Sequence, residues 1–264
     1  MRIYSWNMLF RNRELDRAFD FIAQSDFDIF CIQEVPEAFL KRLQTLPYFI
    51  NSHFDFMAYR SDVERLFRRG TERNFVVTLS KHPITAQGEI LFPDYWHLLP
   101  VRSRIFVTLM WPFYFSKIQN RGGLYADIMI NGTHVRVFNL HLILAHPAWR
   151  LKEFEMAMIE RDASKPTIVC GDFNILEKPR VTLLNWILGG HIKDALLHKR
   201  ERTHIEQRFV EHSLANPLRG EITHSVSQSQ LDHILVSNSF SIKNASVLPD
   251  CIGSDHHPIR VEIE

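Results

Sequence analysis

The stretch 167–174 reads Thr-Ile-Val-Cys-Gly-Asp-Phe-Asn and constrains the fold of this chain more than any other segment. Its apolar run, Ile-Val-Cys closed by a glycine, is typical of the end of a buried strand. Asp172 and Asn174 are two residues apart, so both side chains can face one side of an extended segment while Phe173 turns into the core. The carboxyl end of a strand is where α/β proteins tend to build sites. Because Gly-Asp-x-Asn is also a good turn sequence, a turn without a site is the alternative.

The bulk properties describe a globular chain without a dominant charge. A chain of 264 residues can bury a large core, and we expect a single domain over 1–264 because no repeat, low-complexity tract or linker interrupts it. The 31 basic and 30 acidic residues give a net charge of +1, so any binding of polyanions must depend on local patches. No apolar run approaches the ~20 residues needed to span a bilayer.

Two observations predict a cytoplasmic location. The three cysteines are odd in number, and Cys31 and Cys170 lie in apolar runs, so we interpret them as buried free thiols in a reducing compartment. Met1 leads directly into a strand-like segment and not into a basic and then apolar leader, which predicts no secretory signal.

Apolar runs and alternating patterns predict strands, and helical spacing of apolar residues predicts helices. The predicted strands are 2–8, 28–32, 75–79, 124–130, 133–140, 167–172, 231–236, 241–248 and 259–263. The predicted helices are 13–24, 37–46, 147–163 and 179–188. Asn131-Gly132 is a strong turn dipeptide, so the strands on either side of it should form a hairpin. Residues 84–118 are predicted to be irregular and aromatic, and a polar connection is predicted between residue 190 and the strand at 231.

Polar side chains lie at or near the ends of the predicted strands, one after another. They are Asn7, Glu34, Asn139, His141, Asp172, Asn174, Asp232, Asp255 and His256. Six short segments around them resemble motifs of the endonuclease/exonuclease/phosphatase superfamily of pancreatic deoxyribonuclease, abasic-site endonucleases, deadenylases and bacterial sphingomyelinases. The segments are Ser5-Trp6-Asn7, Ile32-Gln33-Glu34-Val35, Asn139-Leu140-His141-Leu142, Gly171-Asp172-Phe173-Asn174, Leu231-Asp232-His233-Ile234 and Ser254-Asp255-His256-His257-Pro258. Each is short, but they follow the family's order along the whole chain, and together they are very specific.

The resemblance implies an α/β (α+β) fold of the deoxyribonuclease I-like kind. This fold is a four-layer sandwich of two packed mixed β-sheets flanked by helices, with the site at one end. The resemblance also implies a metal site in which Glu34 is the main carboxylate, helped by Asn7 and Asp255. Only oxygens are offered, which suits a hard cation such as Mg²⁺ (or Mn²⁺). The alternatives are an Asn7 that simply ends a strand and a solvated Glu34.

For catalysis, the resemblance implies that His256 faces the scissile phosphate and that Asp232 holds its tautomer. Asp172 would position or deprotonate the attacking water, and Asn174 would bind a phosphate oxygen. His141 resembles the second histidine of the deoxyribonuclease and sphingomyelinase branches, a phosphate ligand or a general acid to the leaving oxygen. Abasic-site endonucleases carry a different residue there, which favours the other branches.

Other residues of these motifs are assigned as follows. Asn139 is a candidate contact to the substrate, as is Arg121, because Arg121-Gly122-Gly123 resembles the basic-glycine entry to the family's central hairpin. Packing roles are favoured for His233 and His257. The spacing of the histidines does not match that of zinc hydrolases, so we do not expect the rival zinc site of His141, His146, His256 and His257.

Two segments bear on the substrate. The segment 59–73 forms a basic ridge diluted by three acidic residues, and such a ridge suits a nucleic-acid backbone, although a solvated helix face is the alternative. Its arginines are Arg60, Arg65, Arg68, Arg69 and Arg73. The segment 93–115 is aromatic, and as an exposed hairpin it would suit a membrane interface, whereas packing into the core is the alternative.

The sequence therefore predicts a divalent-metal-dependent hydrolase of phosphoric ester bonds, a nuclease or phosphodiesterase in which water attacks a phosphodiester. Nucleic acid is the favoured substrate, as for an endonuclease. The alternatives are a sphingomyelinase-like phospholipid phosphodiesterase that contacts a lipid surface through 93–115, and a phosphatase. A non-catalytic binding module is least favoured, because a scaffold has no physical need to hold so many charges together. No protein partner is inferred.

Overall fold

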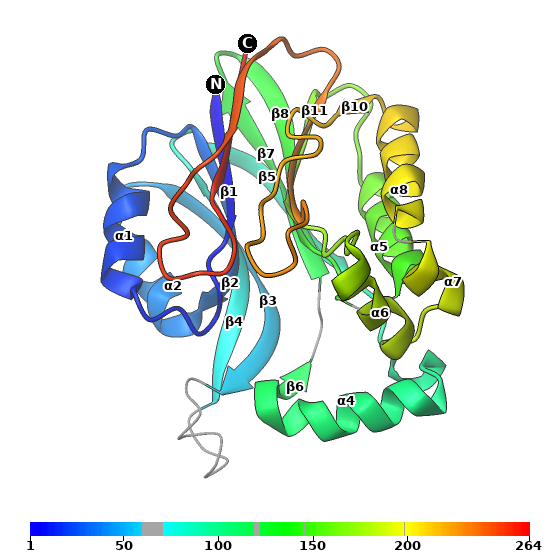
Figure 1. The fold of residues 1–264 in the computed structure, drawn as a ribbon. Helices are drawn as coiled ribbons and strands as arrows, with labels where there is room; N and C mark the ends of the chain where they lie inside the picture. Colours follow the sequence, from blue (N-terminus) through cyan, green and yellow to red (C-terminus); the bar gives the residue numbers. More distant parts are fainter. Residues whose placement is uncertain (60–70, 119–121, 145, 198) are drawn as a thin grey trace.

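The computed structural model describes residues 1–59, 71–118, 122–144, 146–197 and 199–264, and their side chains except at 59 and 110–118. Two mixed β-sheets pack face to face, and helices cover their outer surfaces (Figure 1). The predicted four-layer, deoxyribonuclease I-like sandwich is thus confirmed. The two chain ends lie at the same end of the sandwich, at the top of Figure 1.

The first sheet contains seven strands within the described residues. They are β1 (Arg2–Asn7), β2 (Ile29–Pro36), β3 (Phe49–Tyr59), β4 (Thr71–Ser80), β6 (Phe115–Ile118), β12 (Ile242–Val247) and β13 (Ile259–Ile263). Their order across the sheet is β12-β13-β1-β2-β4-β3-β6. β1 and β2 run parallel, and the other neighbours are antiparallel. A parallel pair needs a crossover, which α1 (Leu15–Gln24) provides.

The second sheet contains six strands in the described part of the chain. They are β5 (Ile84–Leu91), β7 (Gly122–Ile130), β8 (Thr133–His141), β9 (Thr167–Asp172), β10 (Leu214–Ala215) and β11 (Asp232–Ser237). Their order is β10-β11-β9-β8-β7-β5. The predicted hairpin across Asn131-Gly132 is confirmed as β7 and β8. The parallel pair β8 and β9 is joined by α5 (Pro147–Ile159).

The core is divided into three apolar layers, as expected for strands whose side chains alternate between two buried faces. Between the sheets the side chains are mainly aliphatic, for example Ile3, Ile128, Ile168, Ile234 and Val261. Aromatic rings fill the layers between each sheet and its helices. Examples are Trp6 and Phe30 with Phe39 of α2 (Glu37–Leu43) in one layer, and Phe138 and Phe173 with Phe154 of α5 in the other.

The polar connection predicted before residue 231 contains two helices, α7 (Ile192–Leu196) and α8 (Arg200–Glu211), which follow α6 (Pro179–Ile187). Ile205 and Phe209, one turn apart on α8, pack into the core, and the rest of that helix is polar except for the exposed Val210. Two apolar residues are too few for a periodic signal, which explains why the sequence predicted a loop there.

The segment 84–118, predicted to be irregular, is mostly ordered. It contains β5, a 3₁₀ turn η1 (Trp96–Leu98) and α4 (Val101–Tyr114). Apolar residues occupy almost every position from Ile105 onward, so the sequence shows no helical period. In Figure 1, α4 lies across the lower end of the sandwich, between α6 and β6. Among the described residues, no helix is both long and apolar enough to cross a membrane.

Strand ends from both sheets meet at one end of the sandwich. In the first sheet, Asn7 at the end of β1 lies opposite Gln33 of β2. In the second sheet, Asp172 at the end of β9 lies opposite both His141 of β8 and Asp232 of β11. The sheets therefore bring the predicted polar residues together without any long loop.

Candidate active site

Asn7 and Glu34 come from the two parallel strands of the first sheet. A register shift between Ile32 and Val35 forms a bulge in β2, where Glu34 adopts a positive φ of 57°. Such a conformation is unfavourable for a non-glycine residue and recurs at functional sites, because a bulge can re-aim a side chain. Asn7 Nδ2 donates to Glu34 Oε1 at 3.2 Å and to Asp172 Oδ2 at 3.0 Å, so Asn7 links the two sheets at the site.

Asp172 ends β9, directly after the glycine that closes its apolar run. Gly171 has a φ of 138°, and a Cβ there would lie 1.9 Å from Leu140 O, so only glycine fits beside β8. Asn174 also has a positive φ, 54°, and its backbone N–H donates to Asp172 Oδ1 at 2.8 Å. Its Nδ2 donates to Leu142 O at 2.9 Å, a bond that uses one of the two N–H groups of the amide.

His256 is held by a buried aspartate of the other sheet. Its Nδ1 lies 2.8 Å from Asp232 Oδ2, so Nδ1 carries the shared proton and Nε2 faces Asp172 Oδ2, 3.8 Å away. Burial lowers the pKa of His256, but the charges of Asp232 and Asp172 raise it more, to about 10. Without a metal, this imidazole is charged at neutral pH.

His141 is held in the same way by Asp55, a residue that the sequence did not single out. His141 Nδ1 lies 2.5 Å from Asp55 Oδ2, and Asp55 is fully buried within β3. Burial lowers the pKa of His141, but Asp55 and the other carboxylates raise it to about 9. Asp55 follows no strand end, but an acid between Phe54 and Phe56 in a strand-like run was a signal that it needs a buried partner.

Asp172 lies between the two imidazoles. Its Oδ2 is 3.9 Å from His141 Nε2 and 3.8 Å from His256 Nε2. Burial raises the pKa of Asp172, but the two histidines lower it more, so the carboxylate stays ionised near neutral pH. One proton acceptor and two proton donors thus converge on one small volume, which is the set of groups that ester hydrolysis needs.

The carboxylates assigned to a cation are poorly neutralised by the protein itself. Burial raises the pKa of Glu34, whose described partners are the amide of Asn7, a backbone N–H and His141, with no Lys or Arg among them. Asp255 Oδ1 is buried and accepts no hydrogen bond in the described part of the chain, while its Oδ2 pairs with His224 Nε2 at 3.2 Å. A divalent cation would offset both charges, so the residues present fit a hard metal ion.

Potential ligand atoms also converge in two groups of the described residues, and both groups contain His256. In each group the ligand atoms lie within 4.8 Å of one another. The first group is His224, Asp255 and His256, and the second is Asp172, Asp232 and His256. The site therefore contains an aspartate and histidine cluster that could hold a metal ion.

The structure gives Asn139 a different environment from the predicted one. It is fully buried between the sheets, where Nδ2 donates to Val77 O at 2.8 Å and Oδ1 accepts from Gln33 Nε2 at 2.7 Å. Its polar atoms are occupied, so it has no free face for a substrate, and we assign it to joining the sheets beside the site. Arg121, the other predicted contact, lies outside the described residues.

The remaining histidines of the motifs have packing partners, as the sequence favoured. His233 is fully buried and stacks on Phe173 with ring centroids 4.6 Å apart, and burial lowers its pKa well below the usual value. His257 Nδ1 lies 2.9 Å from Leu248 O. The three cysteines are free thiols.

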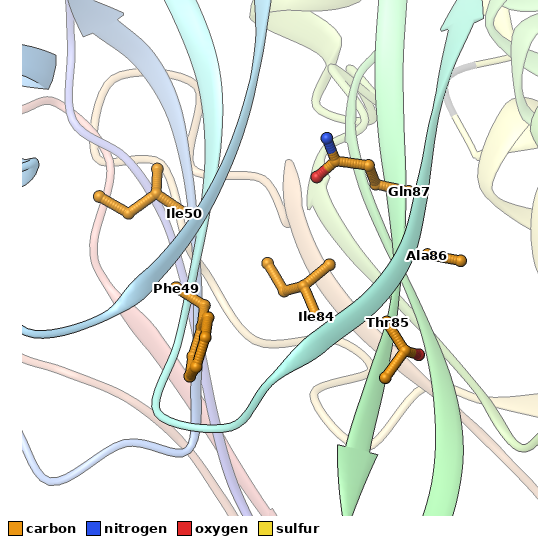
Figure 2. A pocket seen from close by; sticks show the side chains of 6 residues that line it. All are labelled: Phe49, Ile50, Ile84, Thr85, Ala86 and Gln87. Carbon is orange, nitrogen blue, oxygen red and sulfur yellow. The ribbon is translucent and has the colours of Figure 1, made fainter.

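A hollow between β3 and β5 lies apart from these groups (Figure 2). It is formed at the start of β3, away from Asp55, and carries no titratable side chain. Its lining residues are Phe49, Ile50, Ile84, Thr85, Ala86 and Gln87. It therefore takes no part in the chemistry of the site.

Comparison with known proteins identifies the arrangement. Residues 4–256 match the Endonuclease/Exonuclease/phosphatase family. The chain belongs to this family. Members of the endonuclease/exonuclease/phosphatase family are hydrolases of phosphoester bonds. No curated protein matches the chain.

Solved structures of other proteins share the fold at low sequence identity. The chain is similar to an endonuclease/exonuclease/phosphatase protein from Beutenbergia cavernae, with 15% identity, a TM-score of 0.67 and coverage of 100% of this chain and 71% of that one. A family protein from Leptotrichia buccalis has 17% identity, a TM-score of 0.66 and coverage of 100% and 99%. A 3′ phosphatase from Neisseria, bound to a product DNA hairpin, has 19% identity, a TM-score of 0.59 and coverage of 100% and 99%.

Proposed function

We propose that this chain is a divalent-metal-dependent phosphodiesterase in which water attacks the phosphorus. The observation that supports this best is the ionised Asp172 between two imidazoles, each of which is oriented by its own buried aspartate. A phosphodiester is anionic and repels hydroxide. Its hydrolysis needs an activated water, neutralisation of charge and a proton for the leaving oxygen, and the site offers a group for each.

Each role follows from the geometry. Asp172 accepts the proton of the attacking water, because it is the ionised carboxylate at the centre of the site. His256, charged and fixed by Asp232, donates through Nε2 to a non-bridging phosphate oxygen. His141, charged and fixed by Asp55, donates its Nε2 proton to the leaving oxygen.

The remaining polar groups hold the reactants. Glu34, Asn7 and Asp255 would hold the metal ion, which when bound supplies Lewis acidity and neutralises phosphate charge. Asn174 keeps its backbone N–H on Asp172 and offers its second amide N–H to phosphate. A binding module without catalysis is disfavoured, because buried carboxylates that do no chemistry only destabilise the fold.

Nucleic acid is the first substrate class that we propose. Support comes from the arginine-rich segment of the sequence and from the shared fold with the Neisseria 3′ phosphatase bound to a DNA hairpin. Residues 60–70 of the arginine ridge lie outside the described residues. Arg73 is described and forms two hydrogen bonds with Glu37, at 2.8 and 3.1 Å, so it is already paired within the chain.

A phospholipid phosphodiester is the second candidate. The observation that favours it is the row of exposed apolar residues Val101, Ile105 and Leu109 on α4. The two classes differ in what must lie next to the scissile bond, a polyanionic backbone or an amphiphile, so one assay can separate them.

The deciding experiment is hydrolysis of plasmid DNA, single-stranded RNA, sphingomyelin and a phosphomonoester, with Mg²⁺, with Mn²⁺ and with EDTA. We expect metal-dependent cleavage of a phosphodiester, lowered by at least about 10²-fold in Glu34→Gln and in His256→Ala. Matched controls are Glu221→Gln and His134→Ala, which change the same residue types at exposed positions, His134 lying at the far end of β8 from His141. Full activity in both site variants, or equal activity in EDTA, would contradict the proposal.

A further inference from the structure

Helix α4 carries an apolar face that no described part of the chain covers. Val101, Ile105 and Leu109 follow one another at four-residue spacing, so their side chains lie along one face of the helix. They are 63%, 57% and 65% exposed, and Leu98, just before the helix, is 66% exposed. Four aliphatic side chains of this size, in a row and facing solvent, are typical of a surface that binds another apolar surface.

The opposite side of α4 is anchored, which fixes the direction of this face. Ser103 is fully buried, and the Arg102 guanidinium lies 4.9 Å from the centre of the Trp186 ring. Arg102 also donates to Gly190 O at 2.9 Å and to Trp186 O at 3.3 Å, at the end of α6. Because the buried Ser103 lies on the opposite side of the helix from Ile105, the apolar stripe points outward.

The segment that contains α4 has basic residues but no acidic ones. The whole chain is nearly balanced, with 31 basic and 30 acidic residues, yet between Asp94 and Asp127 there is no Asp or Glu. The same interval contains Arg102, Arg104, Lys117 and Arg121. Arg104 is exposed on α4 between Val101 and Ile105. Among the described residues, Arg104 thus places an exposed cation beside the apolar face, and such a face complements a surface that is apolar and anionic.

Helix α4 is connected through β6 to the strand that carries Asp55. The chain passes from α4 directly into β6, which pairs with β3 at Phe56 and Met57, immediately after Asp55. Figure 1 shows α4 along the end of the sandwich, between β6 and α6.

We propose that α4 is an interfacial helix that binds the surface of an anionic phospholipid bilayer. Leu98, Val101, Ile105 and Leu109 enter the boundary between headgroups and acyl chains, and Arg104 contacts lipid phosphate. The helix has 14 residues, about 21 Å at 1.5 Å per residue, so it lies in the interface and does not span the ~30 Å core. A second copy of the chain is a poorer occupant, because two acid-free cationic faces would repel each other.

This binding does not depend on the proposed catalysis, and the two can be tested separately. The first measurement is co-sedimentation of the full chain with vesicles of phosphatidylcholine alone or mixed with phosphatidylserine. We expect binding to the mixed vesicles that weakens with salt. The variant Ile105→Glu/Leu109→Glu should bind at least tenfold more weakly, because two charges replace the centre of the apolar stripe. Arg104→Glu should lose most of the preference for phosphatidylserine.

The matched control is Ile159→Glu/Val210→Glu, which adds the same charge at two aliphatic residues that are also exposed but lie on α5 and next to the end of α8. It should bind vesicles like the wild type. All variants should cleave a small soluble phosphodiester at the wild-type rate, whereas Glu34→Gln should lose cleavage and keep vesicle binding.

Three outcomes would overturn the proposal. The first is no vesicle binding by the wild type, and the second is equal loss of binding in the α4 variant and the control. The third is a wild-type dimer that the α4 variant converts to a monomer, because the stripe would then bind a second copy.

Discussion

At the scale of single residues, three of the contacts that organise the site join one sheet to the other. Asp55 of the first sheet holds His141 of the second. Asp232 of the second sheet holds His256, which lies just before β13 of the first. Asn7 reaches from β1 to Asp172 in the same manner. The geometry of the site is therefore set by how the sheets pack, and a change in one sheet is felt by groups on the other.

Asp55→Asn tests the positioning of His141. The amide keeps the shape of the side chain but removes the charge, so the pKa of His141 should fall from about 9 toward its usual value near 6.5. We expect kcat to fall by about 10- to 100-fold, as for other residues that orient a functional histidine. NMR titration of His141 and the pH dependence of kcat measure the two effects.

The control for this variant is Asp20→Asn, an exposed aspartate on α1. It should leave both the pKa of His141 and kcat unchanged. If the pKa of His141 stays near 9 in Asp55→Asn, a group other than Asp55 raises it and the assignment is wrong.

Gly171→Ala tests the backbone next to Asp172. The new Cβ would meet Leu140 O and the residue would keep a φ of 138°, so we expect the free energy of unfolding to fall by about 3 kcal/mol or more. Gly132→Ala separates strain from collision, because Gly132 also has a positive φ but has no atom within 4 Å of its built Cβ. In urea unfolding, Gly132→Ala should lower the free energy of unfolding by only about 1 kcal/mol. Equal losses would mean that the close approach of β8 is unimportant.

The sequence revealed the site residues that follow strands, because a polar group after an apolar run is a local signal. Asp172 and Glu34 were found in this way, whereas Asp232, which begins its strand, was found from the motif Leu231-Asp232-His233-Ile234. Asp55 lies inside a strand, and its role depends on a partner 86 positions away, which no local pattern encodes. The burial of Asn139 was missed for the same reason, since its partners come from β2 and β4.

At the scale of elements, the helices that follow β8 and β9 are tied together by one buried guanidinium. Arg150 of α5 is fully buried and makes two bonds with Glu201 of α8, at 2.5 and 2.6 Å. It also donates to Asn185 Oδ1 of α6 and to Leu144 O, both at 2.7 Å. Its planar fork suits three partners at once, which a lysine could not reproduce.

Arg150→Leu should lower the free energy of unfolding by about 3–5 kcal/mol, because Glu201 would remain buried without a counter-charge. The double variant Arg150→Leu/Glu201→Leu should recover most of that loss. Arg17→Leu serves as the control, since Arg17 pairs with Glu14 and Asp250 at the exposed surface, and its removal should lower the free energy of unfolding far less than Arg150→Leu does. A double variant as unstable as the single one in urea unfolding would show that the buried charge is not the cause.

Which elements could be predicted depended on how regular their apolar pattern is. The hairpin β7–β8 and the strand β9 show strong local signals and were found. Helix α4 carries apolar residues on its exposed face as well as on the rest of the helix. Its sequence therefore shows neither a helical nor a strand period. Strand β3 carries His53 and Asp55 on a buried face, and those polar residues hid a strand that the tertiary structure stabilises.

At the scale of the whole molecule, the fold accommodates two buried charged histidines, and this makes its stability depend on pH. A histidine whose pKa is raised by folding stabilises the fold fully below its unfolded pKa of about 6.5. That stabilisation is lost as the pH rises through the folded value, about 9 for His141 and about 10 for His256. The loss therefore starts near pH 6.5, well before the lysines titrate.

We accordingly expect the free energy of unfolding, measured by urea in EDTA, to fall from pH 6.5 to pH 8, with a slope of up to about 1.4 kcal/mol per pH unit for each histidine. EDTA is needed because a metal ion beside Glu34 would lower the pKa of both rings. Burial also raises the pKa of Cys170, but that thiol contributes with the same sign only above about pH 8.5, so this range reports on the histidines. Asp55→Asn should remove the contribution of His141 to this pH dependence, so the free energy of unfolding should fall less steeply with pH. A free energy of unfolding that does not fall between pH 6.5 and pH 8 would show that folding does not raise the pKa of either ring, and proton donation would then have to come from another group.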